Sequence, residues 1–151
     1  MSPLLQDWVT IQADQQPEKR AIVGQDGELT YQDLEMTSNQ LSRQLHDSGC
    51  RKGDRVCLLL PKSTRAILAM LGALKSGAMY VPLDPDGAPA RLAKKVEKSN
   101  AAFILAAPEL EEMLNRILAS EGLQHEVRVG WMGSREKLSD ERPVEFSRED
   151  W

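Results

Sequence analysis

The stretch CLLLPKSTR holds the residues of this chain whose order most suggests phosphate chemistry. An apolar run typical of a buried strand leads into Lys62, Ser63 and Thr64 at the expected start of a helix, as in a nucleotide-binding P-loop. A P-loop also needs glycines just before the lysine and five residues earlier, because its backbone N–H groups wrap the phosphates. Those positions hold Pro61, which has no N–H to donate, and Val56. We therefore interpret the stretch as a strand and a core helix capped by Ser63 or Thr64, and leave open a weak anion contact at that helix N-terminus.

Two acids and two tyrosines could also face a ligand. Asp84 and Asp86 flank a proline at the expected carboxyl end of a strand, the edge at which α/β sheets bind ligands. We favour the role of turn formation for these two acids, which are typical of turns. Tyr31 and Tyr80 could orient a ligand, or they could pack half-buried beside a helix start and a strand.

The histidines and cysteines form no pattern that indicates a metal site. His46 and His125 have no Cys, Asp or Glu at the spacing of a zinc site. Cys50 and Cys57 give no disulfide framework, and Cys57 is expected to pack as a small hydrophobe in its apolar run. The sequence also contains no nucleophile-elbow serine and no G-x-G-x-x-G after a strand. We assign no catalytic, cofactor-binding or metal-ligating residue, and we expect no cofactor to bind this chain alone.

Composition narrows the class of protein. The chain has 151 residues, of which 41% are hydrophobic and 28% charged, which suits one soluble domain with a substantial core. A net charge of −4 with scattered basic residues argues against a nucleic-acid partner. The longest apolar run, 66–74, is far shorter than the roughly 18 residues of a membrane span. Asp7 stands where a signal peptide would be positive, so we expect a reduced, cytoplasmic setting without membrane contact.

Apolar spacing predicts the elements that would position these residues. A helix over 4–13 is followed by a hairpin around the turn Asp26-Gly27. Thr30 and Asp33 then form a capping box for a helix that buries a stripe of Leu34, Ser38, Leu41 and Leu45. Strands at 53–61, 78–84, 101–107 and 125–131 alternate with helices at 63–76, 88–99 and from Pro108. The order β-α-β-α-β-α-β predicts an α/β fold, a layer of mostly parallel sheet flanked by helices.

The C-terminal region changes character after residue 133. Residues 134–151 include many charged side chains and few apolar ones, which is typical of a polar linker or disordered tail. The predicted domain therefore covers 1–133.

Several of these stretches together resemble the opening of the adenylate-forming, AMP-binding ligase superfamily. LTYQDL, at 29–34, is similar to its first core motif, and LKSGAMYVPLDP, at 74–85, is similar to its second. GCRKGDRVCLLLPKS resembles the intervening segment, and Pro89, Arg91 and Leu92 match the stretch that follows. The resemblance runs from about Leu4 to Ala106, and Ser76 and Met79 depart from the usual pattern.

The resemblance implies a function that needs more than these residues. Superfamily members use ATP and magnesium to form an acyl-adenylate, then pass the acyl group to coenzyme A or a carrier-protein thiol. The form YVPLDP looks most like the amino-acid adenylation domains of non-ribosomal peptide synthetases. The phosphate loop and later motifs that carry the family's chemistry are absent, and VEFSREDW resembles the linker before that loop.

Three kinds of function follow as expectations. The first is the N-terminal segment of an ATP-dependent carboxylate-activating ligase, inactive alone, whose partners would be a complementary C-terminal ligase fragment or a carrier protein. The second is a stand-alone, non-catalytic interaction module. An α/β layer that is cut midway leaves a strand edge unpaired and apolar helix faces uncovered, and such surfaces favour binding of a partner. A small ATP-using enzyme is a third reading, which the missing glycines at the apparent P-loop oppose.

Overall fold

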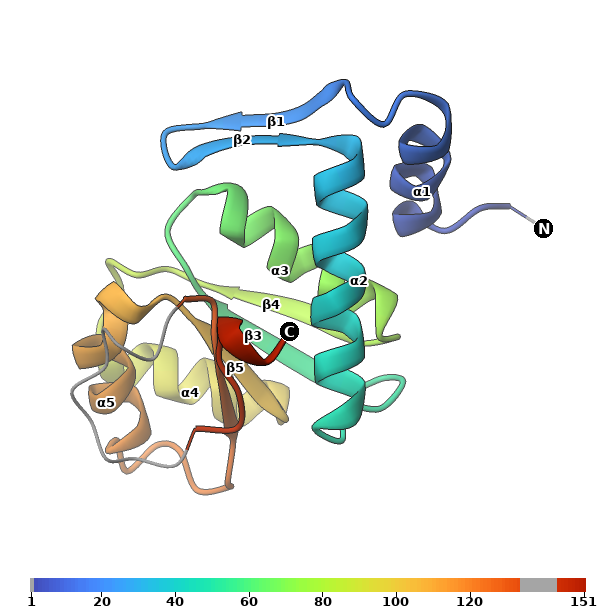
Figure 1. Ribbon diagram of the computed structural model, residues 1–151. Coiled ribbons are helices and arrows are strands. Elements are labelled where there is room, and N and C mark those ends of the chain that lie inside the picture. Colours follow the sequence, from blue (N-terminus) through green and yellow to red (C-terminus); the bar gives the residue numbers. More distant parts are fainter. Residues whose placement is uncertain (1, 134–143) are drawn as a thin grey trace.

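A four-stranded parallel sheet forms the centre of the molecule. The computed structural model describes residues 2–133 and 144–151 (Figure 1). The strands are β3 (Arg55–Leu59), β4 (Met79–Leu83), β5 (Phe103–Ala106) and β6 (Arg128–Trp131), in the spatial order β4-β3-β5-β6. All three pairings are parallel. The predicted α/β fold with a parallel sheet is confirmed.

Helices cover both faces of this sheet. On one face lie α2 (Tyr31–Asp47) and α3 (Thr64–Lys75), and on the other lie α4 (Pro89–Ser99) and α5 (Glu111–Leu118), which follows a short 3-10 turn, η1 (Pro108–Leu110). The chain reaches β4 from β3 through α3, then returns across the sheet through α4 and α5. Right-handed crossovers require the outward and return helices to lie on opposite faces, as observed (Figure 1).

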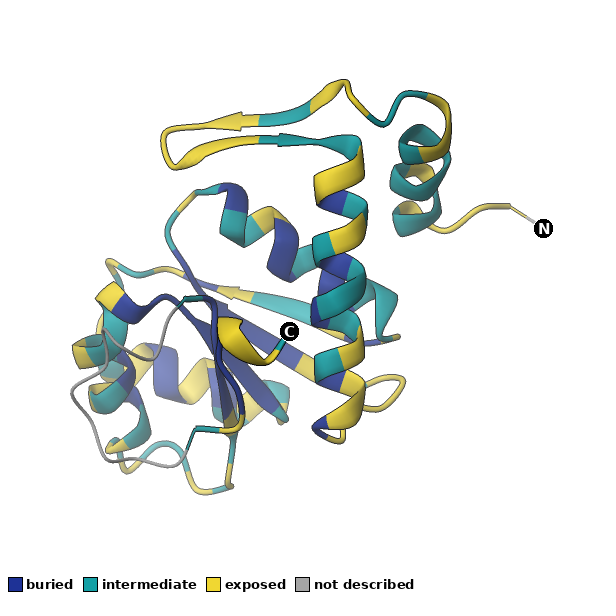
Figure 2. Cartoon of the chain, in the orientation of Figure 1, coloured by how far each residue is buried: buried dark blue, intermediate teal, exposed yellow. Residues whose placement is uncertain are grey.

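Strand alternation divides the core into two halves. In β3, Val56 and Leu58 pack toward α2 and α3, whereas Cys57 and Leu59 pack toward α4 and α5. Consecutive strand residues point to opposite faces, so a continuous apolar run is what a sheet covered on both sides requires. Buried residues accordingly concentrate along the central strands and the inner faces of the helices (Figure 2).

A hairpin and an N-terminal helix lie beside α2 and α3. The hairpin pairs β1 (Arg20–Gly24) with β2 (Gly27–Thr30), and the helix is α1 (Leu5–Gln15). Thr30 accepts a hydrogen bond from the backbone N–H of Asp33, whose carboxylate accepts one in return, so the predicted capping box is confirmed. The buried residues of α2 are the predicted stripe: Leu34, Ser38, Leu41 and Leu45.

Gly72 lets α2 and α3 pack closely. A Cβ atom added at Gly72 would lie 2.5 Å from Cδ2 of Leu41 on α2. The neighbour at this position is a leucine side chain, so the glycine makes room for a large apolar residue of the facing helix.

The C-terminal residues that the structure describes, 144–151, pack against the sheet. Phe146 is fully buried, and its ring lies 6.4 Å from that of Phe103. Residues beside it pair with β6: the N–H of Glu145 donates to Val129 and that of Trp131 to Phe146, both at 2.9 Å. The part of the expected linker at 134–143 lies outside the described residues.

Candidate functional site

Lys62, Ser63 and Thr64 lie where β3 leads into α3, at the carboxyl edge of the sheet. The hydroxyl of Ser63 accepts a hydrogen bond from the N–H of Ala66 at 3.2 Å, which makes Ser63 the N-cap of α3. Lys62 is exposed and Thr64 is buried. The interpretation of this stretch as a strand and a capped core helix is confirmed.

The N-terminus of α3 already holds an anion, the carboxylate of Asp26. The N–H of Thr64 lies 3.0 Å from both oxygens of Asp26, and its hydroxyl donates to Oδ2 at 2.7 Å. The hydrogen bond from the Thr64 N–H is the main cause that lowers the pKa of Asp26, so this carboxyl is ionised at neutral pH. The anion contact left open by the sequence is therefore made by the protein itself.

The hairpin turn delivers this carboxylate. Gln25 and Asp26 form the tight connection between β1 and β2, and Gly27, the first residue of β2, has a φ of 129°, a conformation that favours glycine. Asp26 and Thr64 are 38 residues apart in sequence, so their contact depends on how the hairpin packs over α3. Helix dipoles favour negative charge at this end of a helix.

Arg65 extends this charged cluster across the carboxyl edge. Its guanidinium makes a two-pronged ion pair with Glu109 of η1, with one contact at 3.2 Å. The hydrogen bond to Glu109 is the main cause that raises the pKa of Arg65. The arginine therefore joins α3 to η1, and its charge interacts favourably with the carboxylates of Glu109 and Asp26.

Asp84 and Asp86 form a turn at the same edge. The N–H of Asp86 donates to the Asp84 carboxylate at 2.9 Å, and the N–H of Gly87 donates to the Asp84 carbonyl at 2.9 Å. Both aspartates are exposed. The turn interpretation is confirmed for these acids, whose hydrogen bonds lie within the turn, whereas Thr64 is bonded to Asp26.

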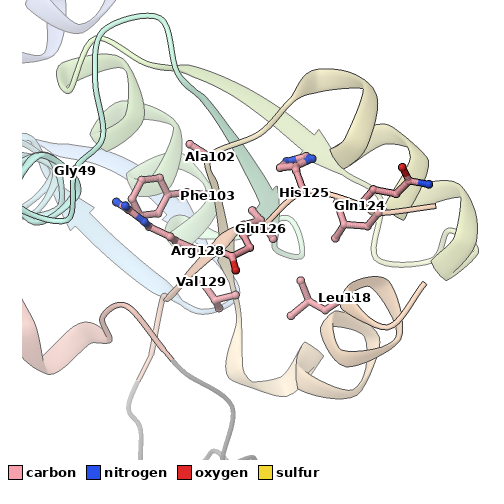
Figure 3. A pocket seen from close by; sticks show the side chains of 11 residues that line it. Gly49, Ala102, Phe103, Leu118, Gln124, His125, Glu126, Arg128 and Val129 are labelled. Carbon is pink, nitrogen blue, oxygen red and sulfur yellow. The ribbon is translucent and has the colours of Figure 1, made fainter. Parts of the chain in front are cut away.

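A cavity of about 720 Å³ opens at the opposite, amino edge of the sheet. It lies between the first residues of β5 and the loop that leads into β6, and includes His125 and Arg128 in its lining (Figure 3). The Arg128 guanidinium lies 5.7 Å from the centroid of the Phe103 ring and donates to the Ser48 carbonyl. This edge is not where α/β sheets usually bind substrates.

An apolar groove of about 370 Å³ runs between α1, the hairpin, α3 and β4. Both candidate tyrosines, Tyr31 and Tyr80, are half-buried in its lining. Trp8 of α1 is 54% exposed and Ile67 of α3 is 37% exposed at the same groove. The sequence predicted the helix that carries Trp8, but periodicity alone does not say whether an apolar face is covered.

The remaining candidates are the two histidines and the two cysteines, which lie apart from the carboxyl edge. His46 is exposed at the end of α2, whereas His125 is hydrogen-bonded to Glu97. Cys50 and Cys57 are buried free thiols. Within 2–133 and 144–151, His, Cys, Asp and Glu nowhere gather in threes that could hold a metal ion. Across the same residues, none of the helices combines the length and apolar character of a membrane span.

Comparison with known proteins agrees with this architecture. The sequence profile of the family described as AMP-binding enzyme matches residues 9–151. Nonribosomal peptide synthetase 8 of Aspergillus fumigatus is 35% identical over 127 residues, covering 75% of this chain and 2% of that protein. Bacitracin synthase 3 of Bacillus licheniformis is 39% identical over 95 residues, covering 63% of this chain and 2% of that protein.

Solved ligase structures share the fold. The nonribosomal peptide synthetase FmoA3, solved with bound α-methyl-L-serine-AMP, superposes with a TM-score of 0.74 at 26% identity, over 87% of this chain and 14% of that one. VinN, solved with 3-methylaspartate, superposes with a TM-score of 0.75 at 23% identity, over 85% of this chain and 34% of that one.

The chain therefore belongs to the AMP-binding enzyme family, and its fold is that of the N-terminal part of adenylate-forming ligases. It spans only a small share of the relatives it matches, 2% of each of the two synthetases named above.

The structure assigns a structural role to each of the two core motifs. LTYQDL supplies the capping box of α2, and LKSGAMYVPLDP supplies the end of α3, the turn at Gly77 and strand β4.

Proposed function

We propose that this chain is the N-terminal α/β layer of an ATP-dependent ligase that activates a carboxylic acid as its adenylate. The observation that carries the proposal is the family match over 9–151. The 35% identity to a nonribosomal peptide synthetase favours an amino acid or a related acid as the substrate of the complete ligase. The reaction joins the carboxylate to AMP and releases pyrophosphate, and a thiol acceptor then takes the acyl group.

In this proposal the layer is a scaffold, and ATP and magnesium are bound by segments outside these residues. The proposal is supported by the start of α3, which resembles a phosphate site. There the N–H of Thr64 already donates to the carboxylate of Asp26, and Pro61 has no N–H. A triphosphate approaching α3 would meet a carboxylate rather than free donors. We accordingly propose no catalytic, cofactor-binding or metal-ligating residue in this chain, and a cytoplasmic setting for the ligase.

The proposed partner of the layer is the remaining part of the ligase, seated on the apolar groove. Its lining is almost entirely apolar, and Trp8 and Ile67 leave large hydrophobic surfaces in water. The chain corresponds to 34% of the length of VinN, so most of a complete ligase lies outside the matched part. A carrier protein is expected to contact the assembled ligase.

Substrate-dependent exchange between ATP and pyrophosphate tests the proposal. The purified chain is assayed alone and with the separately produced remainder of a related adenylation domain, across the proteinogenic amino acids. We expect no exchange by the chain alone and exchange from the mixture. Exchange by the chain alone would overturn the scaffold role, and a mixture that forms a complex but never exchanges would overturn the ligase assignment.

A matched pair of variants tests the groove as the docking surface. Trp8→Ser removes the exposed indole from the groove, and Met36→Ser removes a side chain of the same 54% exposure that does not line it. We expect Trp8→Ser to weaken binding of the remainder by about tenfold or more, as for an interface anchor, and Met36→Ser to leave it unchanged. Equal effects of the two variants would place the contact elsewhere.

The groove also favours the alternative of a non-catalytic interaction module. In that case the groove would bind a protein unrelated to ligases, and the mixture with a ligase remainder would neither associate nor exchange. Size-exclusion chromatography of the mixture separates the two functions before any activity is measured.

A further inference from the structure

His125 lies in the loop 119–127, between α5 and β6, and contacts two hydrogen-bond acceptors at once. Its Nδ1 is 2.7 Å from a carboxylate oxygen of Glu97, and its Nε2 is 2.9 Å from the carbonyl oxygen of Ala101. An ionised carboxylate and a backbone carbonyl only accept hydrogen bonds. Both contacts can therefore form together only when both ring nitrogens carry protons, which is the charged form of histidine.

Glu97 is held in its ionised form by the same loop. The oxygen that faces the ring also accepts hydrogen bonds from the N–H of Gln124 at 2.9 Å and from the N–H of His125 at 3.4 Å. The Gln124 hydrogen bond is the first cause that lowers the pKa of Glu97, and the His125 side chain adds to it. The proton between the two side chains therefore belongs to the imidazole.

The charged ring joins three elements. Glu97 is in the last turn of α4, Ala101 precedes β5, and His125 itself is in the loop that lines the cavity of about 720 Å³. Figure 3 shows the His125 ring between the start of β5, near Ala102, and the loop.

Other charged groups lie on the elements around the ring. Lys94 of α4 packs against the loop at Gly122. Its Cγ lies 3.4 Å from the position that a Cβ atom would take at Gly122. Glu126 and Arg128 line the same cavity as His125. Arg128 donates to the Ser48 carbonyl, and Glu97 is the carboxylate that makes the ion pair with the His125 ring.

We propose that His125 is a pH-sensitive latch on the loop 119–127. The charged ring ties the loop to α4 and to the start of β5. When the ring gives one proton to solvent, it keeps a proton on one nitrogen only, so one of the two hydrogen bonds is lost and the loop opens more often over the cavity. The latch is a property of this layer and does not depend on the proposed ligase activity.

Amide hydrogen exchange tests the latch, because the N–H groups of Gln124 and His125 are donors in the same contact. The readout is the protection factor, which compares each measured rate with the intrinsic rate at that pH. From mildly acidic to mildly alkaline pH, we expect the protection of Gln124 to fall about tenfold, the effect of losing one hydrogen bond to a charged group. Nitrogen NMR of the ring should show two N–H groups at the acidic end and one at the alkaline end.

Three variants test whether His125 causes the pH dependence. His125→Gln cannot titrate and should give low protection of Gln124 at every pH, whereas His46→Gln, which removes the other histidine of the chain, should behave as the wild type. Glu97→Gln keeps an acceptor but removes the charge, and should weaken the pH dependence. Protection of Gln124 that does not change with pH in the wild type, or that changes equally in His125→Gln, would overturn the latch.

Discussion

At the scale of single residues, Asp26 determines what the start of α3 can bind. Lys62, Ser63 and Thr64 stand in the order of a phosphate site, and the residues at 56 and 61 argue against such a site. Sequence reasoning did not find the carboxylate that fills the position. Asp26 was recognised as a turn residue, and nothing in local spacing indicates that the turn reaches a helix 38 residues further on.

Asp26→Asn is predicted to destabilise the fold. The variant keeps the shape of the side chain but loses the charge that accepts from the N–H and hydroxyl of Thr64, so we expect a loss of about 1 kcal/mol in the free energy of unfolding, as for a lost helix cap. Urea denaturation at neutral pH measures this loss. Asp14→Asn, which changes an exposed aspartate of α1, is the control and should have no effect beyond error.

The same comparison has a defined pH dependence. Because folding lowers the pKa of Asp26, its contribution is fully present above the ordinary aspartate pKa of 3.8 and is lost as the pH falls through the lower folded value. The stability difference between wild type and Asp26→Asn should therefore shrink in acid. A difference that stays constant down to the acid unfolding transition would show that the charge contributes nothing.

At the scale of elements, periodicity predicted the helices and strands of the parallel layer well. The capped start of α2 and its buried stripe follow from local patterns that the core reinforces. Hydrophobic periodicity predicted less where the packing of a segment depends on a single residue. Residues 144–151 read as a polar segment, yet the aromatic side chain of Phe146 is fully buried and the backbone of the segment is hydrogen-bonded to β6.

Gly130 explains why Phe146 fits. A Cβ atom at Gly130 would lie 2.3 Å from the Phe146 ring, so only glycine leaves room for the aromatic side chain on this face of β6. A glycine inside a predicted strand is a known sign of close approach by another group. In this sequence it was the one signal that could have indicated a partner for the C-terminal residues.

Phe146→Ala is predicted to be strongly destabilising. The ring is fully buried against Phe103 and Gly130, and removing it leaves a cavity, so we expect a loss of about 3–5 kcal/mol in the free energy of unfolding. Thermal and urea denaturation measure it. Glu145→Ala is the matched control, since that side chain is exposed and its backbone N–H still donates to Val129. If both variants were equally stable, the segment would not be part of the core.

At the scale of the whole molecule, two apolar layers share one sheet. Each central strand contributes alternate residues to both layers, so neither layer can separate without breaking β3 and β5. The hairpin and α1 are the exception, because their apolar side chains form a groove instead of closing a core. Their exposure could not be predicted from the chain alone, since it depends on what, if anything, covers them.

The two cysteines report on the two layers separately. Cys50 belongs to the layer of α2 and α3, and Cys57 to that of α4 and α5. Burial raises the pKa of both thiols, that of Cys57 to about 11, so each is a poor nucleophile while folded. Alkylation at neutral pH should therefore require unfolding at both sites.

Because the layers share the sheet, we predict that both cysteines become reactive over the same range of urea. Trypsin cleaves after Arg51, Lys52 and Arg55, so mass spectrometry resolves labelling at Cys50 from labelling at Cys57. The two labelling curves should coincide with each other and with the loss of helical circular dichroism, as for a cooperative transition. If Cys50 were labelled at clearly lower urea than Cys57, the layer next to the hairpin and α1 would open on its own. The apolar groove would then be the weak side of the fold, and binding of a partner there should raise the urea needed to label Cys50 before it affects Cys57.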